Sequence, residues 1–402
     1  LSENTGLQQK IALPGLAGTV ALGAVQIVAW GGSFYIMAVL AAPVSRETGW
    51  SQQWIYGALS LAILISGLLA PLSGRIIART GGRAMLAASR AVIAAGLTLI
   101  GLSHALWLFL LAWALIGVGM AMGLYDALFA TLGTLYGGAA RRAITSITLI
   151  SGFCTTLVWP VCALLIEWLG WRHACFAYAA LLLCCVFPAY LFALPAGGGK
   201  KAPVDRRAPK GESALPGRLF WLLCAIFTLA SVIMTAISVQ LIALLQAQGY
   251  TLAGALAVSA VLGPCQVASR VVDIAFKRGH PIWTALFSVG LVALGLVMLT
   301  LFPHLAIVSM LVYGAGNGLR AIVRGTLPLV LVNAEDYALI TGRMARPALI
   351  GQALTPLMGG WVFHAFGAQI TLLVLCALAL INVVLTLLLK AQLPRKEAEQ
   401  SV

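Results

Sequence analysis

The sequence predicts an all-α integral membrane protein whose twelve transmembrane helices form two pseudo-symmetric six-helix bundles. The first observation is composition: of 402 residues, 61% are hydrophobic and only 9% are charged, whereas about a quarter of the residues in soluble globular chains are charged. The second is a series of twelve apolar runs, each close to the roughly 20 residues that span a bilayer. The third is one polar segment that separates the first six runs from the last six.

The first six runs predict the helices of an N-terminal bundle. Gly31 and Gly32 lie inside the first run and Pro160 lies inside the fifth. Transmembrane helices tolerate such residues because neighbouring groups satisfy the freed backbone. Glycine also lets its own helix loosen or lets a neighbouring helix approach closely. The six runs are residues 16–43, 52–77, 84–103, 106–135, 144–168 and 173–194.

The last six runs repeat features of the first six, which predicts a second bundle of the same design. Pro160 is followed by Gly170 at the end of the fifth run, and Pro356 is followed by Gly367 at the end of the eleventh. The fourth and tenth runs each carry a Gly-x-Gly step before a polar stretch. The six runs are residues 219–246, 251–276, 281–302, 305–332, 344–364 and 367–389.

The segment between the two sets is polar and rich in glycine, proline and lysine, which predicts a cytoplasmic linker. The predicted domains are residues 1–194 for the N-terminal six-helix bundle, 195–217 for the linker and 218–402 for the C-terminal six-helix bundle. Two similar halves joined by a loop are typical of a rocking transporter whose site lies between the halves.

The distribution of lysine and arginine predicts that both termini face the cytoplasm. With the N-terminus inside, the opposite side of the membrane receives only Arg46 and Arg172. Cytoplasmic loops carry the excess of positive residues in membrane proteins, so we expect a multi-pass protein of the cell inner (plasma) membrane. The inner side receives Lys10, Arg79, Arg83, Arg141, Arg142, Lys277, Arg278, Arg343, Lys390 and the basic residues of the linker.

The net charge of +14 does not indicate nucleic acid binding, because the positive residues lie at the ends of apolar runs and not in one patch. This pattern fits loops held against an anionic leaflet. The sequence shows no nucleophile–base pair, no metal-ligand spacing and no phosphate-binding loop. We therefore expect no enzyme activity, no cofactor and no metal. The expected partners are a small-molecule substrate of anionic character, the lipid bilayer and protons, and the expected state is a monomer.

The loop after the second run resembles the signature of the major facilitator superfamily. It reads Gly74-Arg75-Ile76-Ile77-Ala78-Arg79-Thr80-Gly81-Gly82-Arg83, where the family has G-x-x-x-D-R-x-G-R-R. Ala78 replaces the family aspartate, and Gly82 replaces an arginine. The resemblance extends to the twelve helices and the central loop, so it implies the major facilitator fold for nearly the whole chain.

Within that superfamily, the chain looks most like the monocarboxylate and oxalate–formate branch, which implies a carboxylate substrate. Gly263 and Arg270 lie at the interval of that branch's glycine and substrate-binding arginine, but Gln266 replaces its usual acid, and the first helix has no lysine. The fifth run lacks the G-P-x-x-G-G signature of drug–proton antiporters. The other similar stretches are Trp50-Ser51, Gly119 to Leu128, Arg141-Arg142 and Gly170-Trp171-Arg172.

Charged residues inside the apolar runs indicate partners or ligands, because a charge at the bilayer centre costs about 2.5–3.5 kcal/mol on insertion scales. Five of the seven are arginines, which predicts a positive interior suited to an anion. They are Arg90, Asp126, Arg270, Asp273, Arg320, Arg324 and Arg346. The candidate substrate-binding residues combine two of these arginines with polar and aromatic residues of the runs. They are Arg270, Arg320, Trp30, Tyr35, Gln266, Asn317 and Gln352.

Three of these charges are candidates for gating or proton coupling, namely Asp126, Arg324 and Asp273. Asp126 and Arg324 lie at equivalent depths in the fourth and tenth runs, so one hypothesis is that they pair across the central cavity. The alternative is pairing within each half, for example between Asp126 and Arg90, although Arg90 is also expected to snorkel to the cytoplasmic face. Asp273 lies three residues after Arg270, where one helix face holds both. Arg346 is expected at the membrane interface, because it opens the eleventh run.

These observations predict a secondary active transporter that moves a small organic anion, in particular a monocarboxylate, by alternating access. Coupling to protons through Asp126 is part of this hypothesis. An efflux transporter for drugs, metalloids or other xenobiotics is the alternative within the same class. A non-transporting membrane sensor is the alternative from another class, and the longest polar stretch available to it is the central linker.

Overall fold

The computed structural model describes residues 16–194, 216–275 and 279–393, and in these ranges nearly every residue is helical. The first half begins with α1 (Leu16–Trp30), which a short π-helix (Gly31–Tyr35) joins to α2 (Met37–Thr48). A second π-helix (Leu182–Val186) joins α8 to α9. The other helices are α3 (Gln52–Thr80), α4 (Arg83–Leu102), α5 (Leu106–Gly123), α6 (Tyr125–Tyr136), α7 (Ala140–Ser151), α8 (Cys154–Leu181) and α9 (Phe187–Ala193).

The second half contains fewer and longer helices, and it ends in one helical segment of 59 residues. Short 3-10 helices lie between α6 and α7 and between α13 and α14. The helices are α10 (Gly217–Ala247), α11 (Leu252–Ala260), α12 (Leu262–Ala275), α13 (Pro281–Leu301), α14 (Ala306–Leu331) and α15 (Ala334–Gln392).

Three glycines in left-handed or extended positive-φ conformations turn the longest helical segments back across the bilayer. Ten helical segments in the described residues are long and apolar enough to span a membrane. The segment over residues 335–392 would be about 87 Å long if straight, nearly three times the ~30 Å hydrocarbon core. Turns at Gly137 (φ 54°), Gly170 (φ 75°) and Gly367 (φ 79°) divide three of these segments. Because residues 140–151 and the stretch before Gly170 together form one pass, the described chain makes twelve passes.

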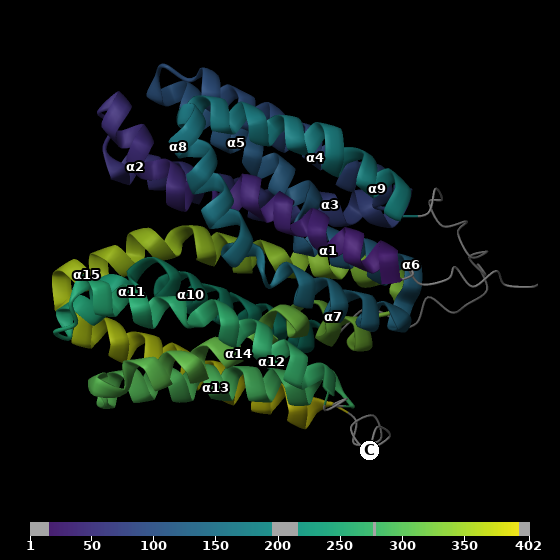
Figure 1. The fold of residues 1–402 in the computed structure, drawn as a ribbon. Helices are drawn as coiled ribbons and strands as arrows, with labels where there is room; N and C mark the ends of the chain where they lie inside the picture. The colour runs from purple at the N-terminus through teal and green to yellow at the C-terminus, as the bar shows by residue number, and fades with distance from the viewer. Residues whose placement is uncertain (1–15, 195–215, 276–278, 394–402) are drawn as a thin grey trace, which may run out of the picture.

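Gly170 and Gly367 also confirm the repeat that the sequence predicts. Each follows a proline-containing helix, and each adopts nearly the same backbone conformation. In Figure 1, α1 to α6, α8 and α9 lie in the upper part, and α10 to α14 lie in the lower part, with α15 and α7 next to both. The structure is thus an all-α membrane protein of the predicted fold. The predicted domain boundaries remain a prediction, because most of the linker, residues 195–215, lies outside the described residues.

The Gly31-Gly32 pair has both effects expected of glycine in a membrane helix. The first pass loosens into a π-helix over Gly31–Tyr35. The absence of side chains also admits Tyr178, because a Cβ atom on Gly32 would lie 2.6 Å from the Tyr178 ring. The Tyr178 hydroxyl then donates a hydrogen bond of 2.9 Å to the carbonyl oxygen of Val28. The pair therefore fixes the contact between the first and sixth passes.

The eleventh pass begins earlier than predicted, and this corrects the position of Arg346. The helix starts at Ala334 and not at residue 344, with Glu335 and Asp336 in its first turn. Acidic residues stabilise a helix N-terminus, but hydropathy alone excludes them from an apolar run. Arg346 consequently lies well inside the helix, where its carbonyl oxygen is close to Gly67 of α3.

Candidate functional site

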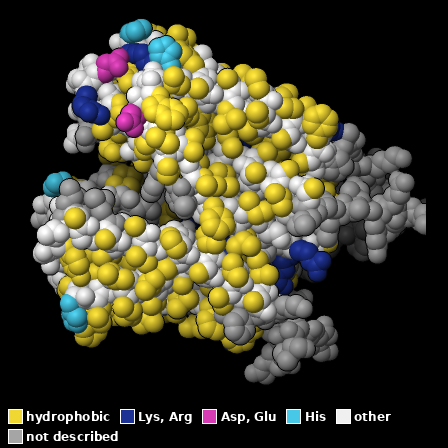
Figure 2. All heavy atoms as spheres, viewed as in Figure 1, with side chains coloured by type: hydrophobic (Ala, Val, Ile, Leu, Met, Phe, Trp, Pro, Cys, Tyr) yellow, Lys and Arg dark blue, Asp and Glu magenta, His cyan; other side chains and the backbone are white. Residues whose placement is uncertain are grey.

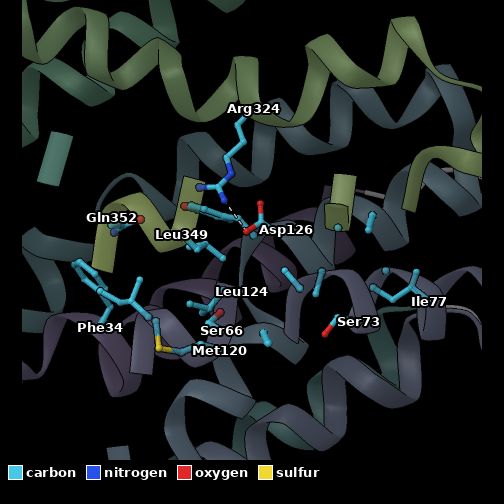
Figure 3. A pocket seen from close by; sticks show the side chains of 18 of the residues that line it. Phe34, Ser66, Ser73, Ile77, Met120, Leu124, Asp126, Arg324, Leu349 and Gln352 are labelled. Atoms are coloured by element: carbon cyan, nitrogen blue, oxygen red, sulfur yellow. Dashed lines mark hydrogen bonds and ion pairs between the residues drawn. The ribbon is translucent and has the colours of Figure 1, made fainter. Parts of the chain in front are cut away.

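Asp126 of α6 and Arg324 of α14 form an ion pair between the two halves of the molecule. The Nη2 atom of Arg324 lies 2.7 Å from Oδ2 of Asp126, and the two side chains are 16% and 26% exposed. Figure 3 shows Arg324 reaching across to Asp126 at the edge of a cavity. The contact predicted from the repeat is therefore present. Its role in gating or proton coupling remains a prediction.

Arg90 does not pair with Asp126, and it does not snorkel, so both of those predictions are wrong. The Arg90 side chain is fully buried in α4. Its Nη2 atom donates to the carbonyl oxygen of Gly123, and its guanidinium lies 5.1 Å from the centre of the Tyr190 ring. No proline or other sequence signal predicts the break between α5 and α6, which leaves the Gly123 carbonyl without a helical donor.

Close packing between the halves accompanies the ion pair at the same end of the molecule. Gly74 of α3 and Gly342 of α15 lie so close that a Cβ atom on either would collide with the backbone of the other helix. Gly325 of α14 similarly lies against Phe129 and Ile144 of the first half. This end, near Leu194 and Gly217, is therefore closed.

The opposite end of the molecule is the one where α2 and α11 lie (Figure 1). Figure 2 shows a hollow between the upper and lower halves at this end. The molecule is therefore closed at the end near its described termini and opens toward the other end.

Arg270 of α12 also connects the two halves. Its Nε atom donates to the carbonyl oxygen of Gly318 at 3.0 Å, and its Nη1 atom donates to the carbonyl oxygen of Thr148 at 2.6 Å. Thr148 belongs to the first half, and Gly152 on the same helical stretch leaves space for the guanidinium. Asp273, by contrast, accepts a hydrogen bond of 3.0 Å from the Thr284 hydroxyl of α13.

An aromatic cluster lies on the first half beside these arginines. The Trp30 ring centre is 5.7 Å from that of Phe34, 6.0 Å from that of Tyr35 and 5.0 Å from that of Tyr125. Tyr125 also stacks on Phe129 at 5.1 Å. Arg270 and Arg320 lie close to both Tyr35 and Tyr125, so the cluster faces positive charge from the second half.

Arg320 of α14 is a buried arginine with a single hydrogen bond to another described residue. Its Nε atom donates to Oδ1 of Asn317 at 3.0 Å, and its charge interacts with those of Arg324 and Arg270. No carboxylate among the described residues forms an ion pair with it. Arg320 and Asn317 line a second cavity within the C-terminal half, together with Asn382. The guanidinium is therefore able to bind an additional acceptor.

The cavity beside the ion pair has a volume of about 40 Å³. Three membrane passes of the first half and two of the second contribute to its walls, and Figure 3 shows Ser66, Asp126, Arg324 and Gln352 around it. Trp30 and Phe34 close one side. The cavity thus lies between the halves, next to the contact that closes one end.

The structure brings most of the predicted site residues into this central region, but not all of them. Trp30, Gln352, Asp126 and Arg324 line the cavity beside the ion pair, and Arg320 and Asn317 line the second cavity. Gln266 packs its backbone closely against Gly318 of α14, and Asp273 lies beside α13. Sequence reasoning missed Phe34, Ser66 and Tyr125. Tyr125 directly precedes Asp126, which was a usable signal, whereas nothing in the sequence distinguishes Ser66 from other serines.

The stretch Gly170-Trp171-Arg172 stabilises the open end of the first half and does not contact the central region. Arg172 forms an ion pair of 3.0 Å with Glu47 and donates to the carbonyl oxygen of Ser103 at 2.6 Å. The Trp171 indole also donates to Glu47. These contacts join the ends of the first, third, fifth and sixth passes.

Comparison with known proteins identifies one family. The model of the Major Facilitator Superfamily matches residues 22–345. The human organic anion transporter MFSD10 (TETRAN) superposes with a TM-score of 0.69 at 14% identity, over 92% of this chain and 98% of that chain. The proton:xylose symporter XylE bound to 6-bromo-6-deoxy-D-glucose gives a TM-score of 0.70 at 14% identity, over 94% and 96%. The transporter FucP in the outward conformation superposes with a TM-score of 0.68 at 14% identity, over 91% of this chain and 98% of that chain. No curated protein matches the sequence.

Proposed function

The chain belongs to the major facilitator superfamily of transporters, and from this membership we propose that it moves a small organic anion, in particular a monocarboxylate, across the membrane by alternating access. The observation that carries the proposal is the charge of the central region. Arg270, Arg320 and Arg324 gather there from the second half, and among the described residues Asp126 forms an ion pair with Arg324 alone. An anion supplies the charge that balances this arrangement.

The geometry of the arginines favours a carboxylate. A guanidinium binds a carboxylate through two parallel hydrogen bonds, and only the Nε atom of Arg320 is engaged, by Asn317. The aromatic cluster around Trp30 and Tyr125 provides an apolar wall beside this charge. The monocarboxylate and oxalate–formate resemblance, carried by Gly263 and Arg270, supports the same substrate class, although Gln266 departs from it.

The size of the cavity favours a small solute over a drug-sized one. Its volume of about 40 Å³ is well below the roughly 300–1,000 Å³ of pockets that hold drug-sized ligands. Efflux of drugs or metalloids is therefore the second candidate function. A ligand screen distinguishes an efflux transporter from a carrier of small carboxylates.

The two ends of the molecule fit one state of an alternating-access cycle. Asp126–Arg324 and the Gly74–Gly342 contact close the end that the positive-inside rule assigns to the cytoplasm. We propose that this is the outward-facing state, that the ion pair is the inner gate, and that protonation of Asp126 weakens it. The proposed location is the inner membrane of the cell, with a monomer as the transporting unit.

The test is a ligand screen followed by transport measurements. Purified protein is heated with organic acids, drugs and oxyanions, because a ligand that binds only the folded state raises the unfolding temperature. We expect stabilisation by small carboxylates, and uptake of the same acid into proteoliposomes. Arg270→Lys keeps the charge but loses the planar guanidinium that binds a carboxylate through two hydrogen bonds, so uptake should fall at least about tenfold. Stabilisation by cationic or neutral drugs alone, with unchanged uptake in Arg270→Lys, would instead support the efflux transporter.

A further inference from the structure

The fourth membrane pass is broken beside the cavity. Leu124 separates α5 from α6 with an extended backbone (φ −81°, ψ −167°). The hydrogen bonds across this break are those from the amide of Leu124 to Met120 and from the amide of Leu128 to Leu124, and no side chain caps α6. The amides of the first turn of α6 therefore lack helical acceptors. Leu124, Tyr125, Asp126 and Ala127 line the cavity.

The two helix ends at the break differ in their hydrogen-bond partners. The carbonyl oxygen of Gly123, at the end of α5, accepts hydrogen bonds from Arg90 and from Nε2 of Gln26. A cation and an amide thus offset the negative end of the α5 dipole. The positive end of α6 has no such partner apart from the carboxylate of Asp126 in its own first turn. Asp126 is already bound by Arg324, so the field at the break remains positive.

Unpartnered polar side chains also line this cavity. Gln352 of α15 is 7% exposed and Ser66 of α3 is 4% exposed. Neither side chain has a hydrogen-bond partner in the part of the chain that the structure describes, and both line the cavity. Trp30 also lines the cavity, and its Nε1 atom is a buried donor that has no partner among the described residues. Figure 3 shows Gln352 and Ser66 on different sides of the space next to Leu124.

These groups share one chemistry. The amides of α6, the Gln352 amide, the Ser66 hydroxyl and the Trp30 indole are all donors, and Arg324 uses only Nη2 toward Asp126. The Trp30 indole is a buried donor without an acceptor, and such a group is costly in a protein interior. An anionic group satisfies several of these donors at once, and the N-terminus of a half-helix at mid-membrane depth favours negative charge.

We propose that the anionic group of the substrate binds at the break between α5 and α6, held by the first turn of α6, Gln352 and Ser66, with Arg324 as its counter-ion. This inference rests on the proposed function, in which Arg270 and Arg320 provide a positive field for an anion. The inference adds the donors that contact the anion. It also explains the burial of Arg90, which screens the carbonyl end of α5 from the anion.

The experiment measures binding of formate, acetate and oxalate to the purified full chain by calorimetry. Loss of a hydrogen bond to a charged group weakens binding by at least about tenfold. We expect such a loss in Gln352→Leu and in Ser66→Ala. Gln240→Leu is the matched control, since Gln240 is a glutamine of equal burial in α10 that lies against Gly359, outside the cavity. Asp126→Asn should bind several times more tightly, because it removes a negative charge from the site.

Gln352→Glu keeps the size of the side chain, so it tests the site even where Gln352→Leu fails to fold. It should abolish binding of all three acids by repulsion. Parent-like binding in Gln352→Glu and Ser66→Ala, together with loss of binding in Arg320→Met, would overturn this inference and leave the proposed function standing. A parent protein that binds none of the three acids would overturn both.

Discussion

The ring of Tyr337 lies directly against Gly133, where a Cβ atom would sit 2.2 Å from the ring carbon Cδ1. Tyr337 begins the eleventh pass, and Gly133 belongs to α6 of the first half. The Tyr337 hydroxyl also donates a hydrogen bond of 2.7 Å to the carbonyl oxygen of Gly325 in α14. One buried side chain therefore joins three passes at the closed end, and this arrangement requires glycine at position 133.

The first prediction concerns that contact. In Gly133→Leu the added side chain occupies the place of the Tyr337 ring, so the closed end should separate. Spin labels at Arg79→Cys and Glu335→Cys, both exposed positions at the closed end, report the separation in a cysteine-free background. We expect a second, longer distance population. Tyr337→Phe, which keeps the ring, should lose only about 0.5–1.5 kcal/mol of stability. An unchanged distance distribution in Gly133→Leu would show that the contact does not hold the end closed.

The second prediction concerns the ion pair. Asp126→Arg and Arg324→Asp should each abolish transport, because each places two like charges at a contact of 2.7 Å. The double exchange restores opposite charges and should recover part of the activity. Uptake into proteoliposomes by the parent, both single variants and the double variant is the measurement. No recovery in a double variant that folds normally would argue against a direct role for the pair.

The third prediction uses two glycines inside helices. A Cβ atom on Gly32 would lie 2.6 Å from the Tyr178 ring, whereas a Cβ atom on Gly57 would meet nothing within 4 Å. Gly32→Ala should therefore destabilise the protein by about 1–3 kcal/mol through overpacking. Gly57→Ala should stabilise it by about 0.4–1 kcal/mol. Thermal unfolding of both variants in one detergent is the measurement, and equal shifts would contradict the close packing at Gly32.

The fourth prediction concerns orientation. Gln53 and Arg79 lie near opposite ends of α3, and both are exposed. In cells, Gln53→Cys should react with a membrane-impermeant thiol reagent from outside, and Arg79→Cys should react only after permeabilisation. The parent chain, with its eight native cysteines, provides the background level. Labelling of both positions from the same side would refute the orientation with both termini in the cytoplasm.

Hydropathy was sufficient to predict the twelve passes, since each needs only length and apolar composition. The repeated Pro–Gly pattern further predicted the turns at Gly170 and Gly367, which adopt nearly equal backbone angles. Starts of helices were less accurate. Ala334 lies ten residues before the predicted start because charged first turns stabilise helices yet carry no apolar signal.

The site was predictable only where symmetry supplied a second constraint. The Asp126–Arg324 contact followed from equivalent depths in equivalent helices, which fixes two positions at once. The role of Arg90 was not predictable, because it depends on a break at Leu124 that no proline marks and that leaves a carbonyl group for the guanidinium. The cavity position of Ser66 depends on which face of α3 is turned inward, and an apolar helix with lipid and protein neighbours carries little periodic signal.

The glycine contacts at the closed end determine how that end can open. Gly74 and Gly342 bring two helix backbones together, and dispersion attraction at such distances weakens steeply within the first ångström of separation. Partial opening would therefore lose most of the contact without yet admitting a solute. Intermediate widths are unfavourable, so the closed end should switch cooperatively between sealed and open forms, which limits leakage of ions during the cycle.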